Sequence, residues 1–151
     1  MAKPGKEELP LASQSDIAEL AEKYEACTLP YKNWTHRAHL ALALFYLKNL
    51  SLQDATDRIR NSIKIYNVKC GDGAGYNETI TVLFMKKIFH ELHQPESCPA
   101  LEDELVCLLN ICTVDWLYNY YSKDLIWSDQ AKHQWMEPDI KAFDFRFRNF
   151  L

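Results

Sequence analysis

The sequence predicts an all-α protein: a compact single-domain bundle of about six to seven helices, with a central apolar helix and an extended C-terminal arm. Two patterns lead to this prediction. Along most of the chain, apolar residues recur at spacings of three and four between helix-capping residues such as Ser51 and Ser128. Between Ala38 and Leu47 nearly every residue is apolar, and a helix that is apolar on all sides belongs in the middle of a bundle.

Three parts are expected along the chain: a flexible tail over residues 1–12, a helical domain over 13–140 and a C-terminal arm over 141–151. Prolines and glycine lie among charges in the tail, whereas the domain carries the helical periodicity. Residues 67–75, rich in glycine, are expected to form a loop. The expected helices cover residues 15–27, 35–48, 51–66, 78–93, 100–112, 113–121 and 128–135.

In the arm, the spacing of apolar residues differs from that in the rest of the chain. Phe143, Phe145 and Phe147 alternate with charged residues, which is the period of an extended strand. We expect the arm to lie across the core. The alternative is a segment from Phe143 to Phe150 that binds a partner chain.

Composition excludes several classes of function. A chain of 151 residues fits one domain, and its formal net charge of -4 gives no basic face for DNA or RNA. The longest apolar run, Leu40 to Leu47, is too short to span a membrane, and the first eight residues contain no apolar stretch of the kind a signal peptide has. We therefore expect a soluble, cytoplasmic protein that binds neither nucleic acid nor membrane. No pattern specifies its oligomeric state.

The five cysteines are odd in number, and no two have C-x-x-C spacing. A disulfide framework or a tetrahedral zinc site usually has an even count or closely spaced pairs. The sequence therefore favours free, mostly buried thiols.

Two histidines form the first candidate for a catalytic or metal-binding site. His36 and His39 are three residues apart at the start of an expected helix, so their side chains share a face. The positive end of the helix dipole disfavours a charged imidazole there. A neutral imidazole is what a proton acceptor or a metal ligand requires.

The second candidate is the glycine-containing segment that leads into the helix at residue 78. Glu78 is expected to be ionised beside that helix start, where it can serve as a base or a ligand. The segment lacks the G-K-[ST] of a P-loop, and no strand precedes it, so a nucleotide-binding motif is excluded. Along the preceding helix, we expect Arg60 and Lys64 to face solvent.

These segments also carry a resemblance to a known family. The motifs W-T-H-x-A-H-L at 34–40, Y-N at 66–67, G-Y-N-E-T at 75–79 and W-x-E-P-D at 135–139 resemble those of a family of small uncharacterised bacterial proteins. In the family pattern the third motif reads G-Y-H-E-T. The resemblance implies a cluster of three histidines and a glutamate at the mouth of the bundle. This chain has Asn77 at the third histidine's position, and asparagine is a poor ligand for transition metals.

Three functional interpretations stay open. The first is a pocket where the helix starts near 35 and 78 meet, binding a small molecule or performing acid/base catalysis with His36 and Glu78. Its substrate-binding residues would be Trp34, His39, Asn67, Tyr76 and Asn77. The second is a divalent metal held at the same place by His36, His39 and Glu78. The third is a non-enzymatic interaction domain that binds a partner chain through exposed apolar surface or through the segment from Phe143 to Phe150. The alternative to any site is that both histidines only bond to backbone or carboxylate groups and that Glu78 only caps its helix.

Overall fold

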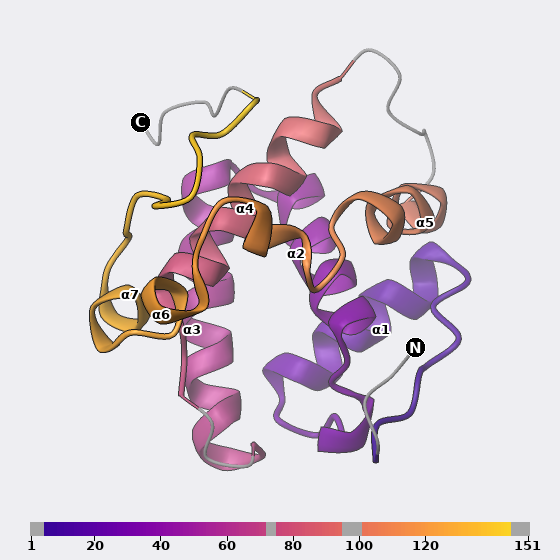
Figure 1. Cartoon of the computed structure of the whole chain (residues 1–151). Coiled ribbons are helices and arrows are strands. Elements are labelled where there is room, and N and C mark those ends of the chain that lie inside the picture. Colours follow the sequence, from indigo (N-terminus) through magenta and orange to yellow (C-terminus); the bar gives the residue numbers. More distant parts are fainter. Residues whose placement is uncertain (1–4, 72–74, 95–100, 146–151) are drawn as a thin grey trace.

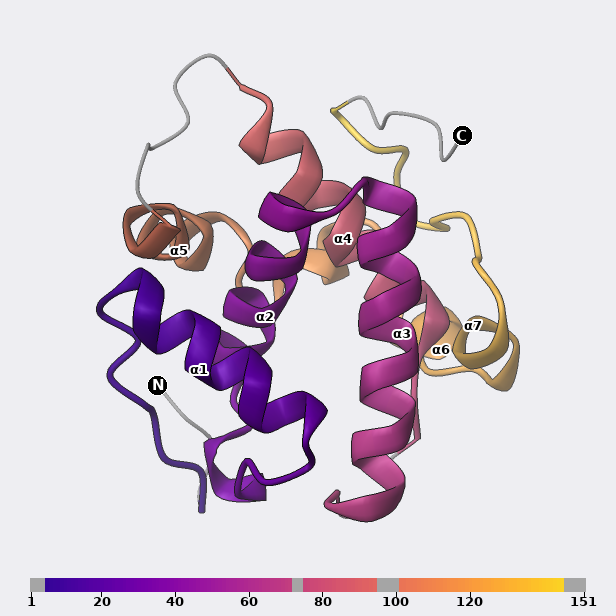
Figure 2. The same cartoon turned by 180° about the vertical axis from the view of Figure 1, so that it is seen from behind.

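Helix α2 (His36–Asn49) lies at the centre of the molecule. The computed structural model describes residues 5–71, 75–94 and 101–145 (Figure 1). Four longer helices pack against α2, as the two opposite views show (Figures 1 and 2). They are α1 (Gln14–Glu25), α3 (Leu52–Lys69), α4 (Glu78–Leu92) and α5 (Leu101–Ile111). The predicted all-α bundle around a central apolar helix is confirmed.

Shorter elements complete the described chain. The 3-10 turn η1 (Tyr31–Asn33) precedes α2, and η2 (Trp116–Asn119) follows α5. Two single-turn helices, α6 (Lys123–Ile126) and α7 (Asp129–His133), pack on each other, and α7 also packs against α4. No helix in the described ranges has both the length and the apolar character needed to cross a membrane.

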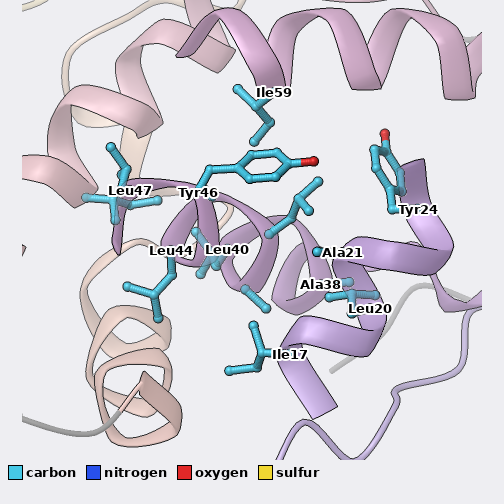
Figure 3. Close-up of a cluster of buried hydrophobic side chains, with 14 of the residues drawn as sticks. Ile17, Leu20, Ala21, Tyr24, Ala38, Leu40, Leu44, Tyr46, Leu47 and Ile59 are labelled. Atoms are coloured by element: carbon cyan, nitrogen blue, oxygen red, sulfur yellow. The ribbon is translucent and has the colours of Figure 1, made fainter. Parts of the chain in front are cut away.

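The burial of α2 explains the architecture. Ala41, Leu42 and Leu44 are fully shielded from solvent, and α1 and α3 supply side chains such as Ile17 and Ile59 to the same core (Figure 3). Burying a leucine side chain completely contributes roughly 1.5–3 kcal/mol, so this helix is stabilised by its neighbours rather than by its own propensity.

Side-chain caps fix where most of the helices begin. In each case a hydroxyl or amide oxygen accepts a hydrogen bond from a backbone N–H in the first turn, which satisfies a group the helix leaves unpaired. The capping residues are Ser13, Thr35, Ser51, Asn77, Ser122 and Ser128. The predicted caps at Ser51 and Ser128 are confirmed, and Thr35 is the cap of α2.

Helix α6 was not predicted, and the observed helix boundaries differ from the expected ones by up to a few residues, most clearly in α3 and in the segment after α5. Helix α3 continues to Lys69, because nothing between Tyr66 and Gly71 breaks a helix. The helix expected over 113–121 is only the 3-10 turn η2. Its tighter winding places residues three apart on one face, which buries both Leu117 and Tyr120.

The first described residues are tied to the body of the protein. The Glu7 backbone N–H donates to the Lys32 carbonyl at 2.7 Å, and Arg37 donates to the Leu9 carbonyl at 2.6 Å. Leu11 is buried in the core. From residue 5 onward, the segment expected as a flexible tail therefore packs beside η1 and the start of α2.

The described part of the C-terminal arm packs on aromatic residues of the domain. The Phe143 ring lies 5.1 Å from that of Tyr120, and Phe145 lies 5.9 Å from Trp116. The Tyr120 hydroxyl donates to Asp144 at 2.6 Å. Residues 141–145 thus lie on the core as expected, and Phe147 and Phe150 fall outside the described residues.

Stacked aromatic rings join α1, α3 and the start of α2. Tyr24 lies between Trp34, at 4.0 Å between ring centroids, and Tyr66, at 4.4 Å. The Tyr66 hydroxyl donates to the Leu29 carbonyl at 2.7 Å. The Tyr24 hydroxyl is buried and finds no hydrogen-bond partner within the described ranges. Burial is the main reason that its pKa lies far above the ordinary value.

These two tyrosines give opposite expectations for removal of the hydroxyl. Tyr24→Phe should raise the free energy of unfolding by about 1 kcal/mol, because it removes a buried, unsatisfied polar group. Tyr66→Phe should lower it by about 1 kcal/mol, because the Leu29 carbonyl loses its donor. Urea denaturation of both variants measures the difference. Equal losses of stability would contradict the structural assignment of the Tyr24 hydroxyl.

Candidate functional site

The start of α4 is held by three side chains that reach different parts of the molecule. Asn77 accepts from the Ile80 N–H at 3.0 Å and donates to the Ile126 carbonyl at 2.7 Å. The Thr79 hydroxyl lies 2.8 Å from the carbonyl oxygens of both Ala131 and Gln134, and it donates to one of them at a time. Asn77 and Thr79 are buried, so they anchor α4 to the α6–α7 region.

Glu78 faces the other way, toward α3. Arg60 donates two hydrogen bonds to its carboxylate, from Nε to Oε1 and from Nη2 to Oε2, and both are 2.8 Å long. The Tyr76 hydroxyl donates to the same carboxylate at 2.7 Å. The Glu78 side chain is 17% exposed and that of Arg60 25%, so this forked pair is partly shielded from water.

The surroundings keep Glu78 charged. Burial alone would raise the pKa of this carboxyl, but hydrogen bonds from Arg60 and Tyr76 and the nearby positive charge of Lys64 outweigh it. The pKa of Glu78 is therefore below its ordinary value. The pKa of Tyr76 is raised, mainly by burial and then by its hydrogen bond to Glu78. At neutral pH the group is thus a carboxylate, a guanidinium and a neutral phenol.

A hollow of about 280 Å³ opens beside this group. It lies where the start of α4 meets α3 and α7, and its size is near the lower end for ligand pockets, which measure about 300–1,000 Å³. Its lining residues are Lys64, Gly75, Tyr76, Glu78, Lys132 and His133. Tyr76 and Glu78 thus line one hollow, but its other described lining residues come from α3 and α7 rather than from the start of α2.

His36 has other partners. Its Nε2–H donates to the Cys112 carbonyl at 2.7 Å. The ring centroids of His36 and Phe84 are 5.8 Å apart, and the two rings are inclined by 71° in an edge arrangement. Phe84 lies six residues after Glu78 on α4, which corresponds to about 9 Å along the helix axis. The contacts of His36 and those of Glu78 therefore belong to separate networks.

His39 and Trp34 lie together at the aromatic stack. Their ring centroids are 3.6 Å apart, and His39 Nδ1–H donates to the Thr35 carbonyl at 2.6 Å. Trp34 is buried. Asn67, half-buried, belongs to the last turns of α3.

The sequence prediction of a solvent-facing Arg60 is wrong, because this residue pairs with Glu78 and is half-buried. Lys132 and His133 also line the hollow, although they were not among the residues predicted for a site. The spacing of Arg60 and Lys64 could have indicated that α3 contributes to the site, because residues four apart share a helix face. No sequence pattern indicated that α7 lines the same hollow.

The residues predicted to bind a metal ion also belong to separate networks of contacts. In the ranges described, no three or more His, Cys, Asp or Glu residues are grouped so as to hold a metal ion. His36 and Glu78 instead bond to a backbone carbonyl and to Arg60.

Comparison of the sequence with known protein families, curated proteins and solved structures gave no match.

The Arg60–Glu78 pair should make stability depend on pH. Because the pKa of Glu78 is lower when folded than its ordinary value of 4.5, its contribution is complete above that value and is lost as the pH falls through the folded pKa. Glu78→Gln should cost about 2 kcal/mol at pH 7, since it breaks a partly buried pair. We expect this difference from wild type to shrink below about pH 4, as measured by urea denaturation.

Asp57→Asn provides the control. Asp57 also contacts Arg60, at 2.7 Å, but its side chain is 48% exposed. A solvent-exposed pair is worth about 0–1 kcal/mol, so this variant should change stability little. An equal or larger cost for Asp57→Asn would contradict the dominant role of Glu78.

Proposed function

We propose that the protein binds a small anionic molecule in the hollow beside the start of α4. The observation that carries the proposal is the placement of two lysines, Lys64 and Lys132, on a hollow where Glu78, the one acidic lining residue in the described part of the chain, is already neutralised. Arg60 binds both oxygens of Glu78, so the positive charges of the lysines are left in excess. An anion of matching size, such as a phosphate or a small dicarboxylate, suits this electrostatic environment.

The wall of the hollow is ordered before a ligand arrives. Tyr76 is fixed through its hydroxyl, and Lys64 Nζ lies 4.9 Å from the centre of its ring. A cation over an aromatic face is attracted to it, which holds the ammonium group beside the hollow. Groups already in place lose less conformational entropy on binding, and this favours affinity.

Binding agrees better with these contacts than acid/base catalysis does. A general base works best with a pKa near the operating pH, whereas the pKa of Glu78 is lowered. His36, the proposed partner of Glu78, donates to the carbonyl of Cys112 instead. We therefore assign Glu78 a positioning role: it orients Tyr76 and Arg60 at the wall.

The test is an NMR titration of ¹⁵N-labelled protein with inorganic phosphate and succinate, with glycerol as the neutral comparison. We expect saturable shifts of the Gly75, Tyr76 and Lys132 amides with the anions and none with glycerol. Replacing both lysines, Lys64→Gln with Lys132→Gln, should weaken binding about tenfold or more, because charge-assisted hydrogen bonds are lost.

Lys23→Gln is the matched control, because Lys23 is a half-exposed lysine on α1 that pairs with Glu19. It should leave the affinity unchanged. Shifts that do not saturate, or an affinity that survives loss of both lysines, would contradict the proposal.

A further inference from the structure

Helix α1 ends in a turn that usually requires glycine. The Thr28 N–H donates to the Lys23 carbonyl at 2.9 Å, and the Cys27 N–H donates to the Tyr24 carbonyl at 3.1 Å. This pair of hydrogen bonds defines a Schellman motif, whose left-handed position is most often glycine. Cys27 occupies that position with a φ of 57°. It is the one residue other than glycine with a positive φ in the ranges the structure describes.

A second cysteine faces this turn from α3. Cys70 is the residue at which α3 ends, and its thiol donates to the Cys27 carbonyl, with Sγ 3.2 Å from the oxygen. Burial, the charge of Cys27 and a hydrogen bond with the Cys27 side chain raise the pKa of the Cys70 thiol. Both thiols are half-buried. The ends of α1 and α3 lie beside one another at the lower edge of the molecule in Figures 1 and 2.

The turn is held against α3 by a buried hydrogen bond as well. The Tyr66 hydroxyl donates to the Leu29 carbonyl at 2.7 Å, two residues beyond Cys27. The backbone around Cys27 is therefore fixed relative to the end of α3, and the two thiols are kept as neighbours. A disulfide forms readily only between cysteines that the fold already holds close together.

From these observations we propose that Cys27 and Cys70 are a redox-active thiol pair that closes to a disulfide by exchange with a small disulfide such as oxidised glutathione. A left-handed cysteine is strained where glycine would not be, and such strain is often retained for a functional reason. The proposal is independent of anion binding, because neither cysteine lines the hollow.

The exchange takes two steps. The thiolate of Cys27 attacks one sulfur of oxidised glutathione; this forms a mixed disulfide and releases one glutathione thiolate. The thiolate of Cys70 then attacks the Cys27 sulfur, which forms the protein disulfide and releases the second glutathione. Each cysteine gives up one proton and each released glutathione takes one up. The two cysteines are oxidised, and oxidised glutathione is reduced to two thiols.

The other described cysteines are placed differently. Cys112 is fully buried, and burial raises the pKa of its thiol to about 12, which leaves it unreactive. Cys107 is exposed on α5. The sequence prediction of mostly buried thiols therefore holds for Cys112 and not for the pair, because Cys27 and Cys70 lie at helix ends rather than on inward faces.

The test uses the full chain, treated under native conditions with oxidised glutathione, alkylated and analysed by peptide mass spectrometry. We expect a linked peptide joining Cys27 to Cys70, which dithiothreitol reverses. Cys27→Ser and Cys70→Ser should instead retain one glutathione on the remaining cysteine of the pair. Cys107→Ser is the control and should still form the link. Absence of the Cys27–Cys70 peptide while Cys107 is glutathionylated would overturn the proposal.

Two thermal measurements complete the test. The cysteines are separated by 43 positions, so closing this loop should raise the Tm of the oxidised protein by about 10 °C above the reduced protein. Cys27→Gly should melt no lower than the reduced wild type, since glycine relieves the strain. A lower Tm for Cys27→Gly would mean that side-chain packing explains the strained cysteine, and would count against a redox role.

Discussion

The burial of α2 on all sides is the constraint on which the rest of the structure depends. A helix without a polar face must be covered completely, and here α1, α3, α4 and α5 cover it. Polar and reactive side chains are then displaced to the ends of helices, where backbone groups also need partners. The Glu78 hollow at the start of α4 and the Cys27–Cys70 pair at the ends of α1 and α3 both occupy such places.

The start of α4 shows how helix ends become ordered sites. Its consecutive residues Asn77, Glu78 and Thr79 each bond to a different element: the end of α6, the middle of α3 and the end of α7. The buried members fix the position of the helix, while the partly exposed Glu78 faces the hollow. Structural and binding roles are thus divided within three residues, because successive side chains at a helix start point in different directions.

Local chemistry accounts for what could be predicted from the sequence. The caps at Thr35, Ser51 and Ser128 depend on hydrogen bonds within a few residues, and the central place of α2 follows from its composition. The site depends instead on contacts between distant segments. His36 meets a carbonyl 76 positions away, and Arg60 meets Glu78 across 18 positions. Such partners are set by how the helices pack, and helical periodicity carries no information about them.

Cys27 shows where local rules and the whole structure disagree. The hydrogen bonds at the end of α1 satisfy the motif fully, yet the residue at its left-handed position has a side chain that raises its energy there. A glycine would make the same backbone bonds without this cost but would have no thiol to place beside Cys70. When one residue breaks a local rule, the compensating contact is the best guide to its role, and here that contact is a second cysteine.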